Sequence, residues 1–125
     1  MKEIDLDLSS VHLYGWERYK LRARIDLFLQ ALDAGKTFPP VFVCAIRGKE
    51  YHLDKRPRDA HNKDHADGGH HRALAHYLSH RPLRAIITGE TPFVPSYSYL
   101  IGELEIVEGP GISISASVLR ERSRS

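Results

Sequence analysis

The segment Asp67-Gly68-Gly69-His70-His71-Arg72 combines groups that can bind an anion. Glycines allow the backbone to approach a ligand closely. The residues that follow them are predicted to open a helix, whose first turn offers unpaired N–H groups and a partial positive charge. An arginine in that turn adds a charged donor, so the segment is a candidate phosphate-binding site. The alternative interpretation is a strand-to-helix turn that carries its histidines on the surface.

Histidines and carboxylates precede this segment, and both are types of side chain that bind transition metals. His61 and His65 are four residues apart and are interspersed with Asp59, Asp64 and Asp67. We expect that His61 and His65 could hold a zinc-like metal. The spacing matches no strong zinc signature, so the alternative is a solvated polar loop.

Glu17 lies in a turn rich in aromatic residues, beside Tyr14, Trp16 and Tyr19. Aromatic surface beside a carboxylate can raise its pKa, and a carboxylate with a raised pKa can serve as a general base. The alternative is a surface glutamate in a loop. Glu17, Asp67 and His70 are the candidate catalytic residues.

Hydrophobic periodicity predicts the elements that must position these groups. The alternation over 4–8 is typical of a strand with one buried face. Residues 19–34 are predicted to form a helix, because an apolar stripe runs along one side of it. The apolar run 41–46 predicts a strand buried on both faces. The apolar stripe of the predicted helix consists of Leu21, Ile25, Phe28, Leu29 and Leu32.

The second half of the chain continues the alternation of strands and helices. Residues 50–53 are typical of the return strand of a hairpin, and 55–66 of a long exposed loop. A helix is expected over about 70–80, with Leu74, Tyr77 and Leu78 on one side and Arg72, His76 and Ser79 on the opposite side. Strands are predicted over 83–87, 104–107 and 112–118. The chain is therefore expected to form one α/β (α+β) domain over 1–119, followed by a disordered tail over 120–125.

Composition limits the classes of protein to which the chain can belong. Its 125 residues suffice for one core, and the net charge of +2 is too small to demand nucleic acid as a partner. Cys44 is the single cysteine, so an intrachain disulfide is excluded, which fits a reducing compartment. The chain has no apolar run of membrane-spanning length and no signal-peptide pattern at its start. We therefore expect a cytoplasmic protein with no membrane partner.

The order of these elements resembles that of the ParB/sulfiredoxin superfamily. The resemblance covers about 4–88 and depends on a Pro-Pro-Val-Phe-Val strand, on Gly69-His70-His71-Arg72 at a helix start, and on a closing strand that follows Pro82. It implies a compact mixed sheet flanked by two main helices. The Gly-His-His-Arg motif is most similar to that of the free-serine-kinase branch, apart from one extra glycine.

The resemblance also implies a ligand and a set of binding residues. Family members bind CTP, ATP or ADP, so a nucleoside di- or triphosphate with Mg²⁺ is the expected cofactor. The phosphates would be held by Gly68, Gly69, His70, His71 and Arg72. Glu17 is the nearest candidate for the glutamate base of the serine kinases. His70 stands where sulfiredoxins carry their reactive cysteine, which argues against sulfinic acid reduction.

Three functional hypotheses follow from these observations. The first is a nucleotide-binding domain that hydrolyses a nucleotide or transfers a phosphoryl group, with magnesium bridging the phosphates. The second is a ParB-like DNA-binding protein or nuclease that uses the histidine-rich site, although no helix-turn-helix follows Val107. The third is a scaffold whose motif only shapes a protein interface.

Overall fold

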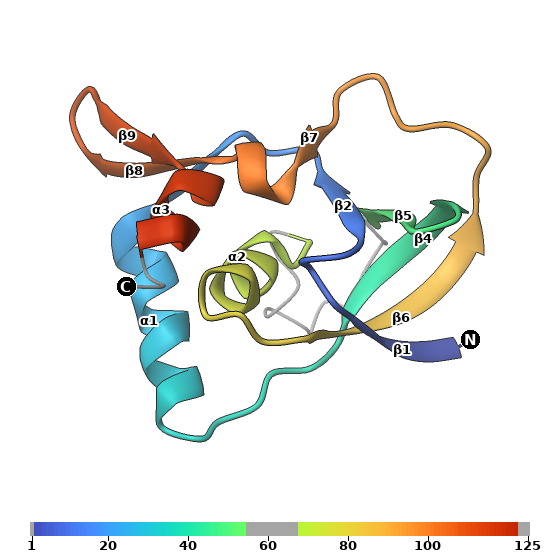
Figure 1. Ribbon diagram of the computed structural model, residues 1–125, viewed down its shortest axis with the longest axis horizontal. Helices are drawn as coiled ribbons and strands as arrows, with labels where there is room; N and C mark the ends of the chain where they lie inside the picture. Colours follow the sequence, from blue (N-terminus) through green and yellow to red (C-terminus); the bar gives the residue numbers. More distant parts are fainter. Residues whose placement is uncertain (1, 55–67, 123–125) are drawn as a thin grey trace, which may run out of the picture.

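The larger of two sheets has six strands, three of which come from the middle of the chain. The computed structural model describes residues 2–54 and 68–122. The six strands are β1 (Lys2–Leu6), β2 (His12–Gly15), β4 (Val41–Arg47), β5 (Glu50–Leu53), β6 (Leu83–Glu90) and β7 (Tyr99–Leu100). Their order in the sheet is β1-β6-β4-β5-β2-β7 (Figure 1). The sheet is mixed, because β4 runs parallel to β6 and antiparallel to β5.

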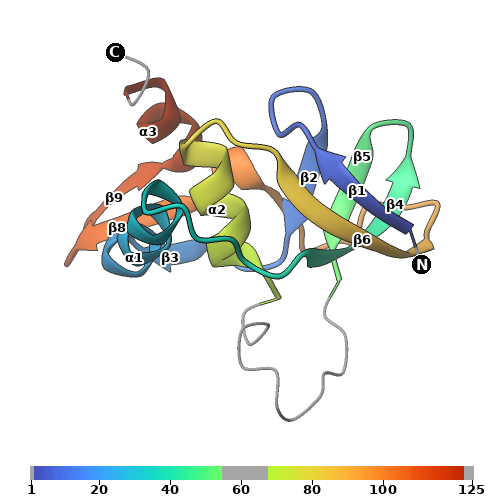
Figure 2. The ribbon, with the colours of Figure 1, turned by 90° about the horizontal axis from the view of Figure 1, so that it is seen from below.

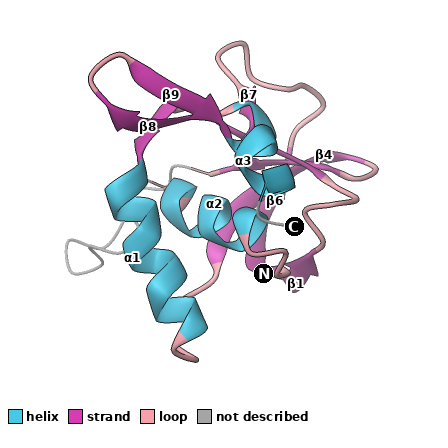
Figure 3. Ribbon diagram, turned by 60° about the vertical axis from the view of Figure 1, so that its left-hand side comes forward, coloured by secondary structure: helices cyan, strands magenta, loops and turns pink. Residues whose placement is uncertain are grey.

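A second sheet and the helices complete the fold. The second sheet has the order β3-β8-β9, with β3 parallel to β8 and β9 antiparallel to it. Helix α2 lies between the six-stranded sheet and α1 (Figures 1 and 2), and Figure 3 shows α1 and α2 side by side. These elements are β3 (Tyr19–Leu21), α1 (Arg22–Asp33), α2 (His70–Leu78), the 3₁₀ helix η2 (Ile101–Glu103), β8 (Glu105–Gly109), β9 (Ile112–Ser115) and α3 (Ala116–Arg122).

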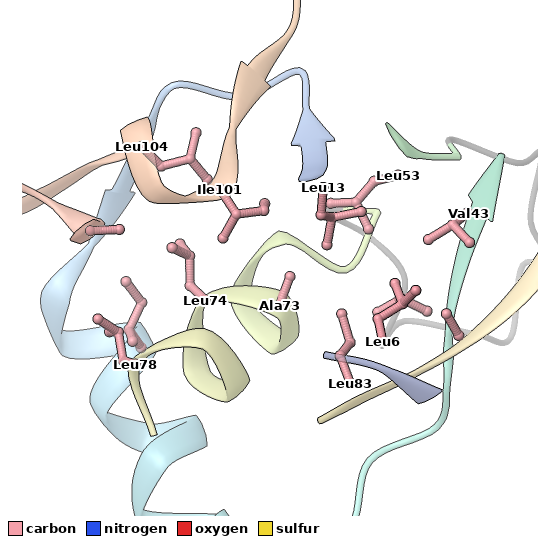
Figure 4. Close-up of a cluster of buried hydrophobic side chains, with 14 of the residues drawn as sticks. Leu6, Leu13, Val43, Leu53, Ala73, Leu74, Leu78, Leu83, Ile101 and Leu104 are labelled. Carbon is pink, nitrogen blue, oxygen red and sulfur yellow. The ribbon is translucent and has the colours of Figure 1, made fainter. Parts of the chain in front are cut away.

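The hydrophobic core surrounds α2. Ala73 and Leu74 are fully buried within one cluster of apolar side chains that come from the large sheet and from the η2 segment (Figure 4). A helix that is apolar on most of its sides is held by neighbours on each of them. Packing along its length therefore fixes the position of α2, including the position of its first turn.

Several predictions from the sequence are confirmed. The described residues form an α+β structure with two mixed sheets and three α-helices. The hairpin of β4 and β5 is present, and α2 begins at His70, directly after the two glycines.

Other predictions about the extent and burial of elements are wrong. Residues 19–21 form strand β3 instead of the first helical turn, because they pair with β8, and Leu21 is exposed. The strand predicted over 112–118 ends at Ser115, where α3 begins. Arg120 belongs to α3 and not to a disordered tail, since its guanidinium bonds to Tyr77 and Ser9. Alternate residues of β4 are only half-buried, so its second face is not part of the core.

Candidate functional site

Gly68 and Gly69 form a sharp corner immediately before α2. Both have positive φ angles, 71° and 94°, which place them in the left-handed region that favours glycine. A Cβ atom on Gly68 would overlap the indole of Trp16, and one on Gly69 would lie 2.6 Å from Cγ1 of Val41. Backbone conformation and close packing against Trp16 and Val41 therefore both require glycine at these two positions.

Arg72 lies beneath this corner and not on the surface. Its side chain is only 2% exposed, and Nη1 donates to the carbonyl oxygens of Pro39 at 2.8 Å and Pro40 at 3.3 Å. A Cβ atom on Gly69 would be 3.4 Å from Nη2 of the same guanidinium. The sequence predicted Arg72 on the side of the helix opposite Leu74, and the structure shows that the rest of the chain covers this side at Arg72. The side chain turns inward because it supplies hydrogen bonds to the segment that leads into β4.

His70 is fully buried and connects α2 to the turn that contains Glu17. Its Nε2 atom accepts hydrogen bonds from the backbone N–H groups of Trp16, at 3.1 Å, and Glu17, at 3.3 Å. The ring also packs edge-on against the Trp16 indole, with the ring centroids 4.5 Å apart. An Nε2 that accepts two hydrogen bonds carries no proton, so we assign the neutral ring with its proton on Nδ1.

The Nδ1 atom of His70 faces the carboxylate of Glu17, at 3.4 Å from Oε2. The same Oε2 atom is ion-paired with Lys20 and is shielded from solvent, while the Glu17 side chain as a whole is 37% exposed. The structure therefore brings the two candidate catalytic residues Glu17 and His70 together, although 53 positions separate them. Glu17 also differs from the expected carboxylate on aromatic surface, since its nearest partners are a cation and an imidazole.

The structure assigns different surroundings to the remaining candidates. The ring of His71 stacks on Phe28 of α1, with the ring planes 13° apart and the centroids at 5.6 Å. Asp67 and the metal candidates His61 and His65 lie outside the described residues. Within 2–54 and 68–122, no three His, Cys, Asp or Glu side chains are grouped so that they could hold a metal ion.

Lys20 is the member of the site that sequence reasoning missed. Its side chain is only 10% exposed and lies beside the Glu17 carboxylate. The i, i+3 spacing of the two residues was the available signal, but Lys20 was placed in the predicted helix over 19–34 and Glu17 in the turn before it. This largely covered lysine brings a second cation, after Arg72, to the region around the first turn of α2.

No protein-family model, curated protein or solved structure matches this chain. Membership of the ParB/sulfiredoxin superfamily therefore stays a prediction that depends on the motif and the order of elements. In the described part of the chain, no helix combines the length and apolar character required to cross a membrane.

Proposed function

We propose that this chain is a nucleotide-binding domain of the ParB/sulfiredoxin type, which hydrolyses a nucleoside triphosphate or transfers a phosphoryl group. One observation carries the proposal. The left-handed corner of Gly68 and Gly69 opens a helix whose first turn has the Arg72 guanidinium behind it and the Glu17 carboxylate beside it. Backbone amides at a helix start, with a cation nearby and a carboxylate within reach, are the groups that phosphoryl transfer requires.

The glycine corner and Arg72 would together bind the phosphate groups of the nucleotide. The backbone amides at the start of α2 would bind the phosphate oxygens, because the partial positive charge of a helix N-terminus attracts anions. Arg72 would act as a fixed positive charge beneath the corner. Its bonds to Pro39 and Pro40 hold the guanidinium in place, so little reorganisation would accompany binding.

Glu17 would be the base, and His70 would hold it in position. Oε2 is engaged by Lys20 and faces His70, which leaves the acceptor capacity of Oε1 for a water molecule or an acceptor hydroxyl. Nucleotide-bound Mg²⁺ is held largely by phosphate oxygens and waters and needs only one or two protein carboxylates, so Glu17 also fits as a single metal ligand. Such an ion would supply neutralisation of the phosphate charge.

A thermal-shift series with ATP, ADP, CTP and GTP, each with and without Mg²⁺, tests the binding. A nucleotide at about 100 times its dissociation constant should stabilise the fold by about 2.7 kcal/mol, which raises the midpoint of thermal unfolding by several degrees. No shift with any of the eight combinations would contradict the proposal.

The chemistry is tested with a pair of matched glutamate variants. Glu17→Gln keeps the shape of the side chain and should abolish phosphate release while nucleotide binding persists. Glu108 is a suitable control, because it is also ion-paired, at 2.7 Å to Arg22, and is similarly exposed at 41%. Glu108→Gln should release phosphate at the wild-type rate. Equal rates for the two variants would exclude Glu17 as the base.

A further inference from the structure

A cleft is lined in part by Tyr77, near the end of α2, whereas the glycine corner lies before its start. The cleft has a volume of about 290 Å³ and is enclosed by the β1–β2 connection, β2, the η2 segment and the start of α3. Its walls are largely apolar, with Leu8, Leu13 and Ile101 among them, and Tyr77 of α2 contributes a phenol. No residue of the glycine corner lines this cleft, so the two sites are separate. An apolar hollow with a few polar groups is the usual form of a small-molecule site.

Gly102 keeps the hydroxyl of Tyr77 accessible. A Cβ atom at position 102 would lie 2.8 Å from the Tyr77 oxygen and 3.5 Å from Cβ of Ser117. The φ angle of Gly102 is outside the left-handed region, so the backbone there does not itself require glycine. Glycine is therefore needed at position 102 because a larger residue would fill part of the cleft, and not because the backbone makes a turn there.

The Tyr77 hydroxyl is available as a hydrogen-bond donor. Among the described residues it makes no hydrogen bond to a protein group. Burial raises the pKa of the Tyr77 phenol above its ordinary value, with the charge of Arg120 opposing the shift. The group therefore keeps its proton at neutral pH. The hydroxyl of this half-buried phenol can therefore donate to a ligand that occupies the cleft.

Arg120 holds the Tyr77 ring in place from its other face. The guanidinium carbon is 4.7 Å from the ring centroid, Nε donates to the Tyr77 carbonyl at 2.7 Å, and Nη2 donates to Oγ of Ser9 at 2.7 Å. These bonds fix the arginine against Tyr77, outside the residues that line the cleft. A cation that stacks on a ring and bonds around it keeps the ring from rotating away.

Two ionisable groups besides Tyr77 line the cleft: His12, whose Nδ1 is 3.7 Å from a carboxylate oxygen of Glu50, and the carboxylate of Glu103. Its Oε1 atom accepts a hydrogen bond from the backbone N–H of Leu100 at 3.3 Å, which holds the carboxylate at the mouth. A carboxylate there repels anions and accepts from N–H donors. The ligand should therefore carry no negative charge, in contrast to the phosphates proposed for the glycine corner.

We propose that this cleft binds a small, uncharged aromatic carboxamide. The ring would lie against the apolar walls, the amide oxygen would accept from the Tyr77 hydroxyl, and the amide N–H would donate to Glu103. The assignment does not depend on the nucleotide proposal, because the two sites share no residue.

Ligand-detected NMR with benzamide and benzoate as probes tests the assignment. Wild-type protein should bind benzamide with a dissociation constant of about 1 mM or lower and benzoate more weakly. Gly102→Ala should weaken benzamide binding at least about tenfold by filling the cleft. Gly109→Ala is the matched control, since a Cβ atom at position 109 meets no other atom within 4 Å. Tyr77→Phe should weaken binding about fivefold through the loss of one hydrogen bond.

Two results would overturn the assignment. The first is no binding of benzamide to the wild-type protein at about 10 mM. The second is equal binding by Gly102→Ala and Gly109→Ala, which would place the probe elsewhere on the surface. If Gly102→Ala does not fold, the Tyr77→Phe variant tests the proposal instead. An unchanged affinity of Tyr77→Phe for benzamide would also refute the proposal.

Discussion

Replacing Gly15 with alanine tests whether His70 is held as tightly as its contacts indicate. A Cβ atom at position 15 would overlap Nε2 of His70 and lie 2.7 Å from Cδ2 of the ring. The ring is fully buried and packed against Trp16, so it has no open space into which to move. The added methyl group must displace either the imidazole or strand β2.

The magnitude follows from the contacts that this displacement removes. Overpacking a core position costs about 1–3 kcal/mol. The two hydrogen bonds that Nε2 accepts from the amides of Trp16 and Glu17 contribute about 1 kcal/mol each. Alanine offsets about 0.4–1 kcal/mol by reducing the freedom of the unfolded chain. We expect Gly15→Ala to lower the free energy of unfolding by about 2–4 kcal/mol.

Urea denaturation followed by circular dichroism measures this change, with Gly89→Ala as the control. Gly89 is also a strand glycine, in β6, and a Cβ atom there would meet nothing within 4 Å. Its replacement should alter stability by less than about 0.5 kcal/mol or increase it slightly. If the two variants unfold at the same urea concentration, the reasoning about His70 is refuted.

Three further predictions concern other parts of the molecule. Arg72→Ala should destabilise the nucleotide-free fold by about 2–4 kcal/mol, because it removes the hydrogen bonds of a buried guanidinium to two backbone carbonyls. Arg84→Ala, on the surface, should cost under about 1 kcal/mol by the same urea assay. Burial lowers the pKa of His76 below 6.5, while its bond to the Pro82 carbonyl opposes the shift. The unfolded chain then binds the proton more tightly than the folded chain, so the free energy of unfolding should fall as the pH drops below 6.5. His76→Gln should reduce the dependence of the urea midpoint on pH between about 7.5 and 5.5. Arg120→Leu should release the Tyr77 ring, which NMR would detect as faster ring flipping; an unchanged rate would contradict the stacking argument.

The sequence alone was enough to predict the features that depend on neighbouring residues. The glycine corner before α2 was predicted because Gly68 and Gly69 suit the left-handed conformation that a turn requires. Strand β5 was also predicted correctly, because Gly48 marks the turn before it. The start of α2 at His70 was predicted from the two glycines that precede it. These features follow from backbone preference and from spacing within a few residues.

Tertiary structure alone decided where the polar groups of the site lie. The burial of Arg72 depends on the carbonyls of Pro39 and Pro40, and the contact of His70 with Glu17 joins residues 53 positions apart. Residues 19–21 likewise became a strand because β8 lies beside them. Periodicity predicts which face of an element is apolar, but it does not say what will cover the opposite face. A charged side chain is buried only where distant groups can satisfy its hydrogen bonds, and those partners are assembled by the fold.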